Sequence, residues 1–77
     1  MKMFCITENI DIALGLKLTG AESVVVQTRE EIENQLEKVL KDSNIGILIF
    51  TDEIYNMAKK NFDEIREKCK LPLLVKL

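Results

Sequence analysis

Few side chains in this 77-residue sequence could carry out catalysis or hold a metal ion. It has two cysteines, Cys5 and Cys69, and no histidine. Because there are only two cysteines, far apart and outside any CxxC pair, and no histidine, the common zinc sites are excluded. The absence of histidine also excludes catalysis that depends on an imidazole. We interpret both as buried thiols in a reducing cytoplasm. The alternatives are a disulfide, or a reactive Cys5 in a small redox or phosphotransfer protein.

Acidic side chains follow two apolar runs that have the composition of strands. Glu8 comes after residues 2–6, and Asp52 comes after residues 45–50. The carboxyl ends of neighbouring parallel strands share one edge of a sheet, so Glu8 and Asp52 could hold a divalent cation there. The favoured interpretation is that Asp52 caps a helix and Glu8 favours a positive helix end. We predict no metal and no cofactor, and keep a receiver-like regulatory module using Glu8 and Asp52 as the alternative function.

Patterns typical of nucleotide or nucleic-acid binding are absent. Neither GxGxxG nor GxxxxGK[ST] occurs in the sequence. The 11 Lys and Arg residues are outnumbered by 13 Asp and Glu residues, whereas phosphate neutralisation requires clustered positive charge. No apolar run approaches the roughly 18 residues of a membrane span. We therefore exclude nucleic acid as a partner and expect no membrane insertion.

The elements that must position these residues begin with four short apolar strands. Their apolar residues run continuously instead of alternating, which is typical of a parallel sheet covered on both faces. Pro72 lacks an N–H, so it fits the first residue of a strand or an edge strand. The predicted strands cover residues 2–6, 24–26, 45–50 and 71–75.

Helix signals fill the three intervals between the strands. Asn9 can cap a helix that extends to about Thr19, and Gly20 is a suitable left-handed stop. Thr28 and Glu31 have the spacing of a capping box at the start of a second helix. Its predicted apolar stripe consists of Ile32, Leu36, Val39 and Leu40.

The third interval predicts one continuous helix. Thr51 or Asp52 would cap it, and the apolar residues recur at steps of three and four, as on one face of an α-helix. The predicted stripe is Ile54, Ala58, Phe62, Ile65 and Cys69.

This alternation predicts an α/β fold with the order βαβαβαβ, as a single globular domain over residues 1–77. We expect a four-stranded parallel sheet with strand order 2-1-3-4, as in the flavodoxin-like arrangement, and helices on both faces. Right-handed crossovers then place the first helix alone on one face, opposite the other two.

The face covered by the first helix is the predicted partner-binding surface. One helix leaves the third and fourth strands uncovered, and this helix is itself apolar on two sides. One stripe consists of Ile10, Ala13, Leu14 and Leu18, while Ile12 and Leu16 point elsewhere. A missing C-terminal helix or a second copy of the isolated chain are alternative occupants of this face. The predicted interface residues are Ile12, Leu16, Thr19, Leu73 and Val75.

Short segments along almost the whole chain resemble one family. MKMFCITENIDIALGLKLTG is similar to the start of the F subunit of the V-type (A-type) ATP synthase, which has a strand, an acidic or Asn-containing loop and a helix ending like Gly15 to Gly20. Further matches follow in the same order and spacing, and these carry the resemblance. They are Val24 to Val26 before Thr28-Arg29-Glu30-Glu31, Asn44 to Ile49 before Thr51-Asp52-Glu53-Ile54, and Leu71 to Val75 as the last strand.

The resemblance implies a non-catalytic part of the central stalk. In that family, the F subunit binds the coiled-coil shaft, called the D subunit, and turns with it inside a ring of A and B subunits. This rotor couples ATP synthesis or hydrolysis to proton or sodium transport, so the implied location is cytoplasmic and peripheral to the membrane. Family members continue into a C-terminal helical segment beyond the last strand. We therefore expect this chain to correspond to their N-terminal domain.

Because the sequence has no phosphate-binding loop and no histidine, we expect the chain neither to hydrolyse ATP nor to bind it tightly. Titration with Mg-ATP followed by calorimetry should show no saturable heat. Saturable binding at about micromolar concentration would contradict a non-catalytic role.

Overall fold

A computed structural model describes residues 1–77 and has a single four-stranded parallel sheet with the order β2-β1-β3-β4. The predicted α/β class and strand order are confirmed. None of the helices is both long and apolar enough to cross a membrane. The elements in chain order are β1 (Lys2–Thr7), α1 (Ile10–Lys17), β2 (Glu22–Val25), α2 (Arg29–Lys41), β3 (Ile45–Phe50), α3 (Asp52–Met57), α4 (Lys59–Lys68) and β4 (Leu73–Lys76).

The predicted N-terminal caps of the first two helices are confirmed, but the first helix ends at Lys17, slightly before the predicted end near Thr19. Asn9 is the N-cap of α1, and its side chain accepts hydrogen bonds from two backbone N–H groups of the first turn. Thr28 and Glu31 form the complete capping box of α2. Gly20 has φ of 93°, a left-handed conformation that favours glycine, and it ends the turn after α1. These local signals need only neighbouring residues to act, so the sequence shows them reliably.

The prediction of one continuous third helix is wrong. The chain leaves the helical conformation at Ala58, with φ of −138° and ψ of 41°, which separates α3 from α4. The Tyr55 hydroxyl donates a hydrogen bond of 2.8 Å to Asp63 across this break. Ile54 and Phe62 are nevertheless both fully buried. Because the apolar stripe continues across the break, the periodicity of the sequence cannot reveal it.

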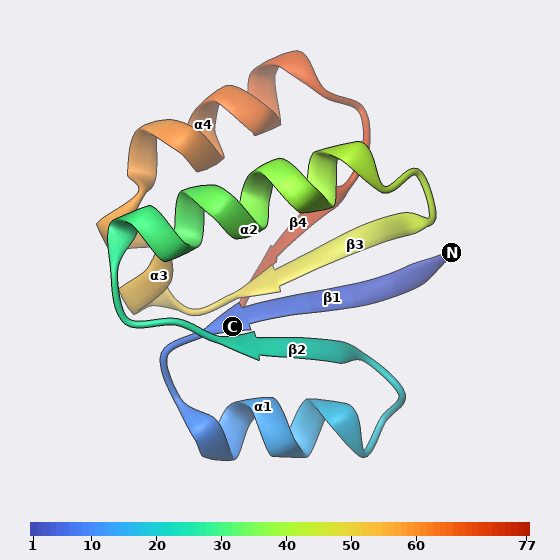
Figure 1. Cartoon of the computed structure of the whole chain (residues 1–77). Coiled ribbons are helices and arrows are strands. Elements are labelled where there is room, and N and C mark those ends of the chain that lie inside the picture. The colour runs from blue at the N-terminus through green and yellow to red at the C-terminus, as the bar shows by residue number, and fades with distance from the viewer.

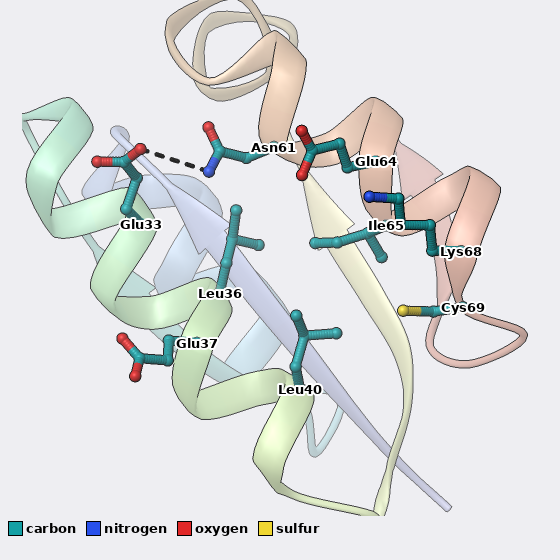
Figure 2. A pocket seen from close by; sticks show the side chains of 9 residues that line it. All are labelled: Glu33, Leu36, Glu37, Leu40, Asn61, Glu64, Ile65, Lys68 and Cys69. Carbon is teal, nitrogen blue, oxygen red and sulfur yellow. Dashed lines mark hydrogen bonds between the residues drawn. The ribbon is translucent and has the colours of Figure 1, made fainter.

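The helices are divided unequally between the two faces of the sheet. Figure 1 shows α1 alone below the sheet, next to β2 and β1, while α2 and α4 lie above it. Figure 2 shows α2 and α4 side by side, with a groove between them. This arrangement follows from right-handed crossovers, because the chain moves one way from β1 to β2 and the other way to β3 and β4. The predicted isolation of the first helix is confirmed.

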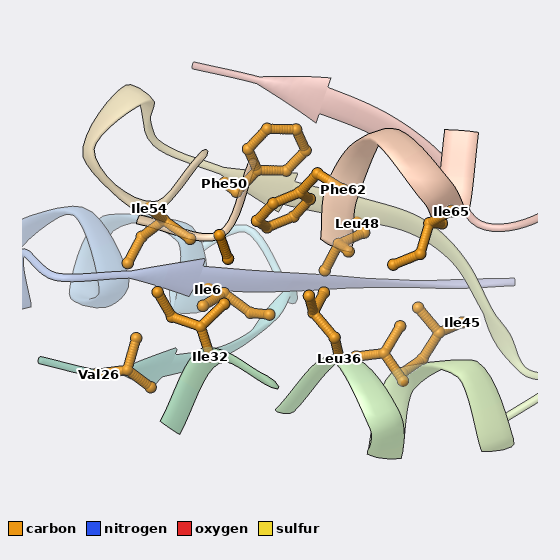
Figure 3. Close-up of a cluster of buried hydrophobic side chains, with 12 residues drawn as sticks. Ile6, Val26, Ile32, Leu36, Ile45, Leu48, Phe50, Ile54, Phe62 and Ile65 are labelled. Atoms are coloured by element: carbon orange, nitrogen blue, oxygen red, sulfur yellow. The ribbon is translucent and has the colours of Figure 1, made fainter. Parts of the chain in front are cut away.

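The main core lies between the sheet and the pair α2 and α4 (Figure 3). The rings of Phe50 on β3 and Phe62 on α4 stack with their centroids 4.3 Å apart. Ile6 and Leu48 are fully buried beneath them. The apolar pattern predicts Leu40 in the buried stripe of α2, but this residue is 46% exposed because it lines the groove instead.

The two cysteines should differ strongly in reactivity. Cys5 is fully buried in β1, and its pKa is raised to about 11 because burial disfavours the thiolate, with a further contribution from the Glu8 carboxylate. Cys69 is half-buried at the end of α4. In the Cys69→Ser variant, a thiol reagent near pH 8 should label native protein only as fast as the protein opens.

The matched Cys5→Ser variant, which retains Cys69, should react faster under native conditions. Both variants should react rapidly in denaturant, and this control shows that the reagent can label either thiol once it is exposed. Fast native labelling of Cys5 would contradict its placement in the interior.

Candidate functional site

Glu8 links the carboxyl ends of β1 and β3, where ligands bind in many open α/β sheets. The hydroxyls of Thr7 and Thr51, both buried, each donate a hydrogen bond to the same carboxylate oxygen of Glu8. The Thr51 hydroxyl also accepts the Ile54 N–H at 3.3 Å, and the Thr7 hydroxyl accepts the Asn9 N–H at 3.1 Å. The hydrogen bonds that the Glu8 carboxylate accepts, first from Thr51, then from its own backbone N–H and from Thr7, hold the pKa of Glu8 below its ordinary value. Glu8 thus acts as a link between strand ends.

Asp52 interacts with a different partner. Thr51, the first of the two predicted caps, is the N-cap of the third helix, and Asp52 is only its first residue. The Asp52 carboxylate forms an ion pair of 3.1 Å with Lys76, whose ammonium lies 5.2 Å from the centre of the Tyr55 ring. No group of three or more His, Cys, Asp or Glu side chains is placed to hold a metal ion. Glu8 and Asp52 thus interact with different partners, the threonine hydroxyls and Lys76.

Two apolar residues of β4, Leu73 and Val75, lie on the face of the sheet that carries α1, whereas Leu74 packs against the core on the other face. Leu73 pairs with Ile47 and Val75 pairs with Ile49, and paired residues of parallel strands project to the same side. Helix α1 packs on β2 and β1 and leaves β4 uncovered. Leu73 is accordingly 59% exposed and Val75 is 43% exposed. We call this the uncovered face, formed by Leu73, Val75 and the flank of α1 that faces them.

Helix α1 carries two further predicted interface residues, Ile12 and Leu16. Ala13 is buried against the sheet, while Ile12 and Leu16 are half-buried. The half-buried Ile12 and Leu16 lie next to the seam between α1 and the sheet, where α1 packs on β2 and β1. Thr19 is exposed just beyond α1, where its hydroxyl donates to the Leu16 carbonyl at 2.7 Å. The five predicted interface residues therefore lie on or beside the α1 side of the sheet.

The opposite flank of α1 differs from what its apolar pattern suggests. The sequence predicts one stripe of Ile10, Leu14 and Leu18 with Ala13, but only Ala13 is buried. Of the nine exposed large hydrophobic residues, one is Met1, one is Leu40, and the others lie on or next to α1 and β4. The sequence predicts this concentration only in part, because it does not show how far α1 is rotated about its axis.

Comparisons with known proteins agree on one family. A family model described as the ATP synthase (F/14-kDa) subunit matches residues 3–77. The F subunit of the A-type ATP synthase of Methanothrix thermoacetophila is 28% identical over 68 residues, which cover 87% of this chain and 69% of that protein. The crystal structure of the V-type ATP synthase F subunit from Archaeoglobus fulgidus has a TM-score of 0.74 at 28% identity. The match covers 99% of this chain and 96% of that one.

The lowered pKa of Glu8 predicts a pH-dependent contribution to stability. Because the folded protein favours the ionised carboxylate, this contribution is complete above the unfolded value of 4.5 and is lost as pH falls through the folded value. At about pH 7, Glu8→Gln should reduce the free energy of unfolding by about 1 kcal/mol or less, because the amide oxygen still accepts a hydrogen bond. At about pH 3, parent and variant should approach equal stability.

Urea unfolding at the two pH values measures this difference. Glu67→Gln is the control, since Glu67 is exposed and has neither an ion pair nor a hydrogen bond through its side chain. A difference between Glu8→Gln and parent that does not change with pH would show that the hydroxyls do not favour the charged form.

Proposed function

This chain belongs to the family of the ATP synthase (F/14-kDa) subunit, as an F subunit of the V-type or A-type enzyme, and we propose that it is a non-catalytic rotor part of the central stalk. In this role it binds the D subunit, which forms the shaft. It contributes to coupling between ATP synthesis or hydrolysis and proton or sodium transport. Residues 1–77 act as one globular domain that makes protein contacts and performs no chemistry of its own.

One observation carries this proposal most directly. Helices α2 and α4 cover one face of the sheet, but α1 covers only the β2 and β1 part of the other face. In layered α/β domains both faces of a parallel sheet are normally covered. Leu73 and Val75 project from the uncovered part and are exposed. A helix of the shaft laid beside α1 would complete the second layer, as α4 does beside α2 on the other face. An apolar, helix-shaped partner fits this surface.

In the proposed role, the chain lies on the cytoplasmic side and is peripheral to the membrane, as part of the ATP synthase complex. The chain would reach the A and B subunits of the ring through the shaft, and the membrane sector through the stalk. Contacts between adjoining apolar surfaces of this kind hold two parts in a fixed orientation, because side chains pack closely at an interface core. A rotor part requires that property, since it must turn together with the shaft.

Replacement of Leu73 by glutamate should separate the chain from the shaft. The change places an unpaired charge in an apolar interface, so affinity should fall by at least about thirtyfold, as for loss of a strong interface residue. Co-expression with a tagged D subunit, followed by pull-down and a binding titration, measures the effect. Val75→Glu should act in the same direction.

Leu40→Glu is the matched control, because Leu40 is a similarly exposed leucine on the opposite face. It should leave the affinity for the shaft within about twofold of the parent. If Leu40→Glu releases the D subunit and Leu73→Glu does not, the uncovered face is not the interface. If the parent fails to bind the D subunit, the stalk role itself is wrong.

A further inference from the structure

The groove between α2 and α4 is a second surface suited to protein contact. It lies on the opposite side of the sheet from the uncovered face. It has a volume of about 290 Å³. Leu36 and Ile65 form its buried part, and Leu40 and half-buried Cys69 lie at one end (Figure 2). Leu40 is the one exposed large hydrophobic residue that lies on a helix of this face. The floor of the groove is therefore apolar and partly open to solvent.

The rim of the groove is negatively charged. Glu33 and Glu37 of α2 and Glu64 of α4 are among the lining residues, and Lys68 is the one cation among them. The Glu33 carboxylate accepts a hydrogen bond of 3.4 Å from the Asn61 amide of α4 (Figure 2). Arg29 pairs with Glu33 and Lys41 pairs with Glu37, but both pairs are exposed and contribute little. Glu64 has no ion pair and no hydrogen bond through its side chain. An incoming cation would therefore find a free carboxylate next to an apolar floor.

The length of the groove limits what can occupy it. Glu33 and Leu40 mark its two ends on α2, and their separation of seven residues corresponds to about 10 Å, or two helical turns. Two helices that pack side by side leave a groove into which the side chains of a third helix fit. Two apolar side chains at i and i+3 or i+4 would reach the floor, with Lys or Arg beside them over the rim.

We propose that the groove between α2 and α4 binds about two turns of a cationic amphipathic helix from a protein partner. Apolar side chains of that helix contact Leu36, Leu40 and Ile65, and its Lys or Arg residues contact Glu64 and the carboxylates of α2. The proposal does not depend on the stalk role, because this groove and the uncovered face lie on opposite sides of the sheet. A contact this small gives a weak, salt-sensitive interaction.

The test uses two model peptides with the same leucines at i, i+3, i+4 and i+7. One carries lysine at the remaining positions and the other carries glutamate. Amide shift mapping with the 77-residue chain should show the lysine peptide changing signals of α2 and α4 around the groove. The glutamate peptide should leave these signals unchanged, and added salt should weaken the lysine peptide's binding.

Two variants and one control locate the contact. Leu40→Ser and Glu64→Lys should each weaken the lysine peptide by about tenfold, and both change exposed side chains, so the fold should persist. Glu67→Lys makes the same charge change on α4 outside the groove and should alter the affinity by no more than about twofold. Thermal unfolding of each variant verifies that it remains folded.

Three results would overturn the proposal. Shift changes confined to α1 and β4 would place the peptide on the uncovered face. Equal binding of the glutamate peptide would remove the role of the acidic rim. Equal losses from Glu64→Lys and Glu67→Lys would show attraction to net charge alone, without a contact in the groove.

Discussion

Right-handed crossovers decide where every other part of this molecule can lie. The chain moves from β1 to β2 in one direction and then to β3 and β4 in the other. With a constant hand, that reversal places α1 on one face and both α2 and α4 on the other. One helix cannot cover four strands, so β4 remains uncovered on the α1 side. Two helices can cover the other face, and the space between them becomes the groove.

The two faces consequently differ in chemistry. On the face of α2 and α4, large side chains such as Phe50 and Phe62 form a continuous core, and carboxylates surround the groove above it. On the face of α1, the buried residues include Cys5, Ala13 and Ile49, while several large apolar residues of α1 and β4 are exposed. The two surfaces proposed for protein contact therefore differ in chemistry and lie on opposite sides of the sheet.

At the carboxyl edge of the sheet, the side chains hydrogen-bond to one another and to the backbone. In many open α/β sheets, ligands bind where the strand order reverses. Here Glu8 occupies that position and accepts hydrogen bonds from Thr7 and Thr51, while the same hydroxyls satisfy backbone N–H groups of the following turns. Hydrogen bonding of this kind joins β1 to β3 at the point where their helices begin.

The sequence by itself determined the class of fold, the strand order and the helix caps, because these depend on local signals and on one general rule of handedness. Asn9, Thr28 and Glu31 act within a single turn, and the apolar runs of β1 and β3 show burial directly. Family membership could be inferred in the same way, from the order and spacing of short segments.

Only the tertiary structure decided the break at Ala58, the partners of Glu8 and Asp52, and the exposure of Leu40. Each depends on residues that are distant in the sequence or on the rotation of a helix about its axis, and periodicity carries no information about either. The apolar pattern around α1 is compatible with several rotations, and only packing against β1 and β2 buries Ala13 while leaving Ile10 and Leu14 exposed. The groove is likewise a property of two packed helices together, so neither segment shows it alone.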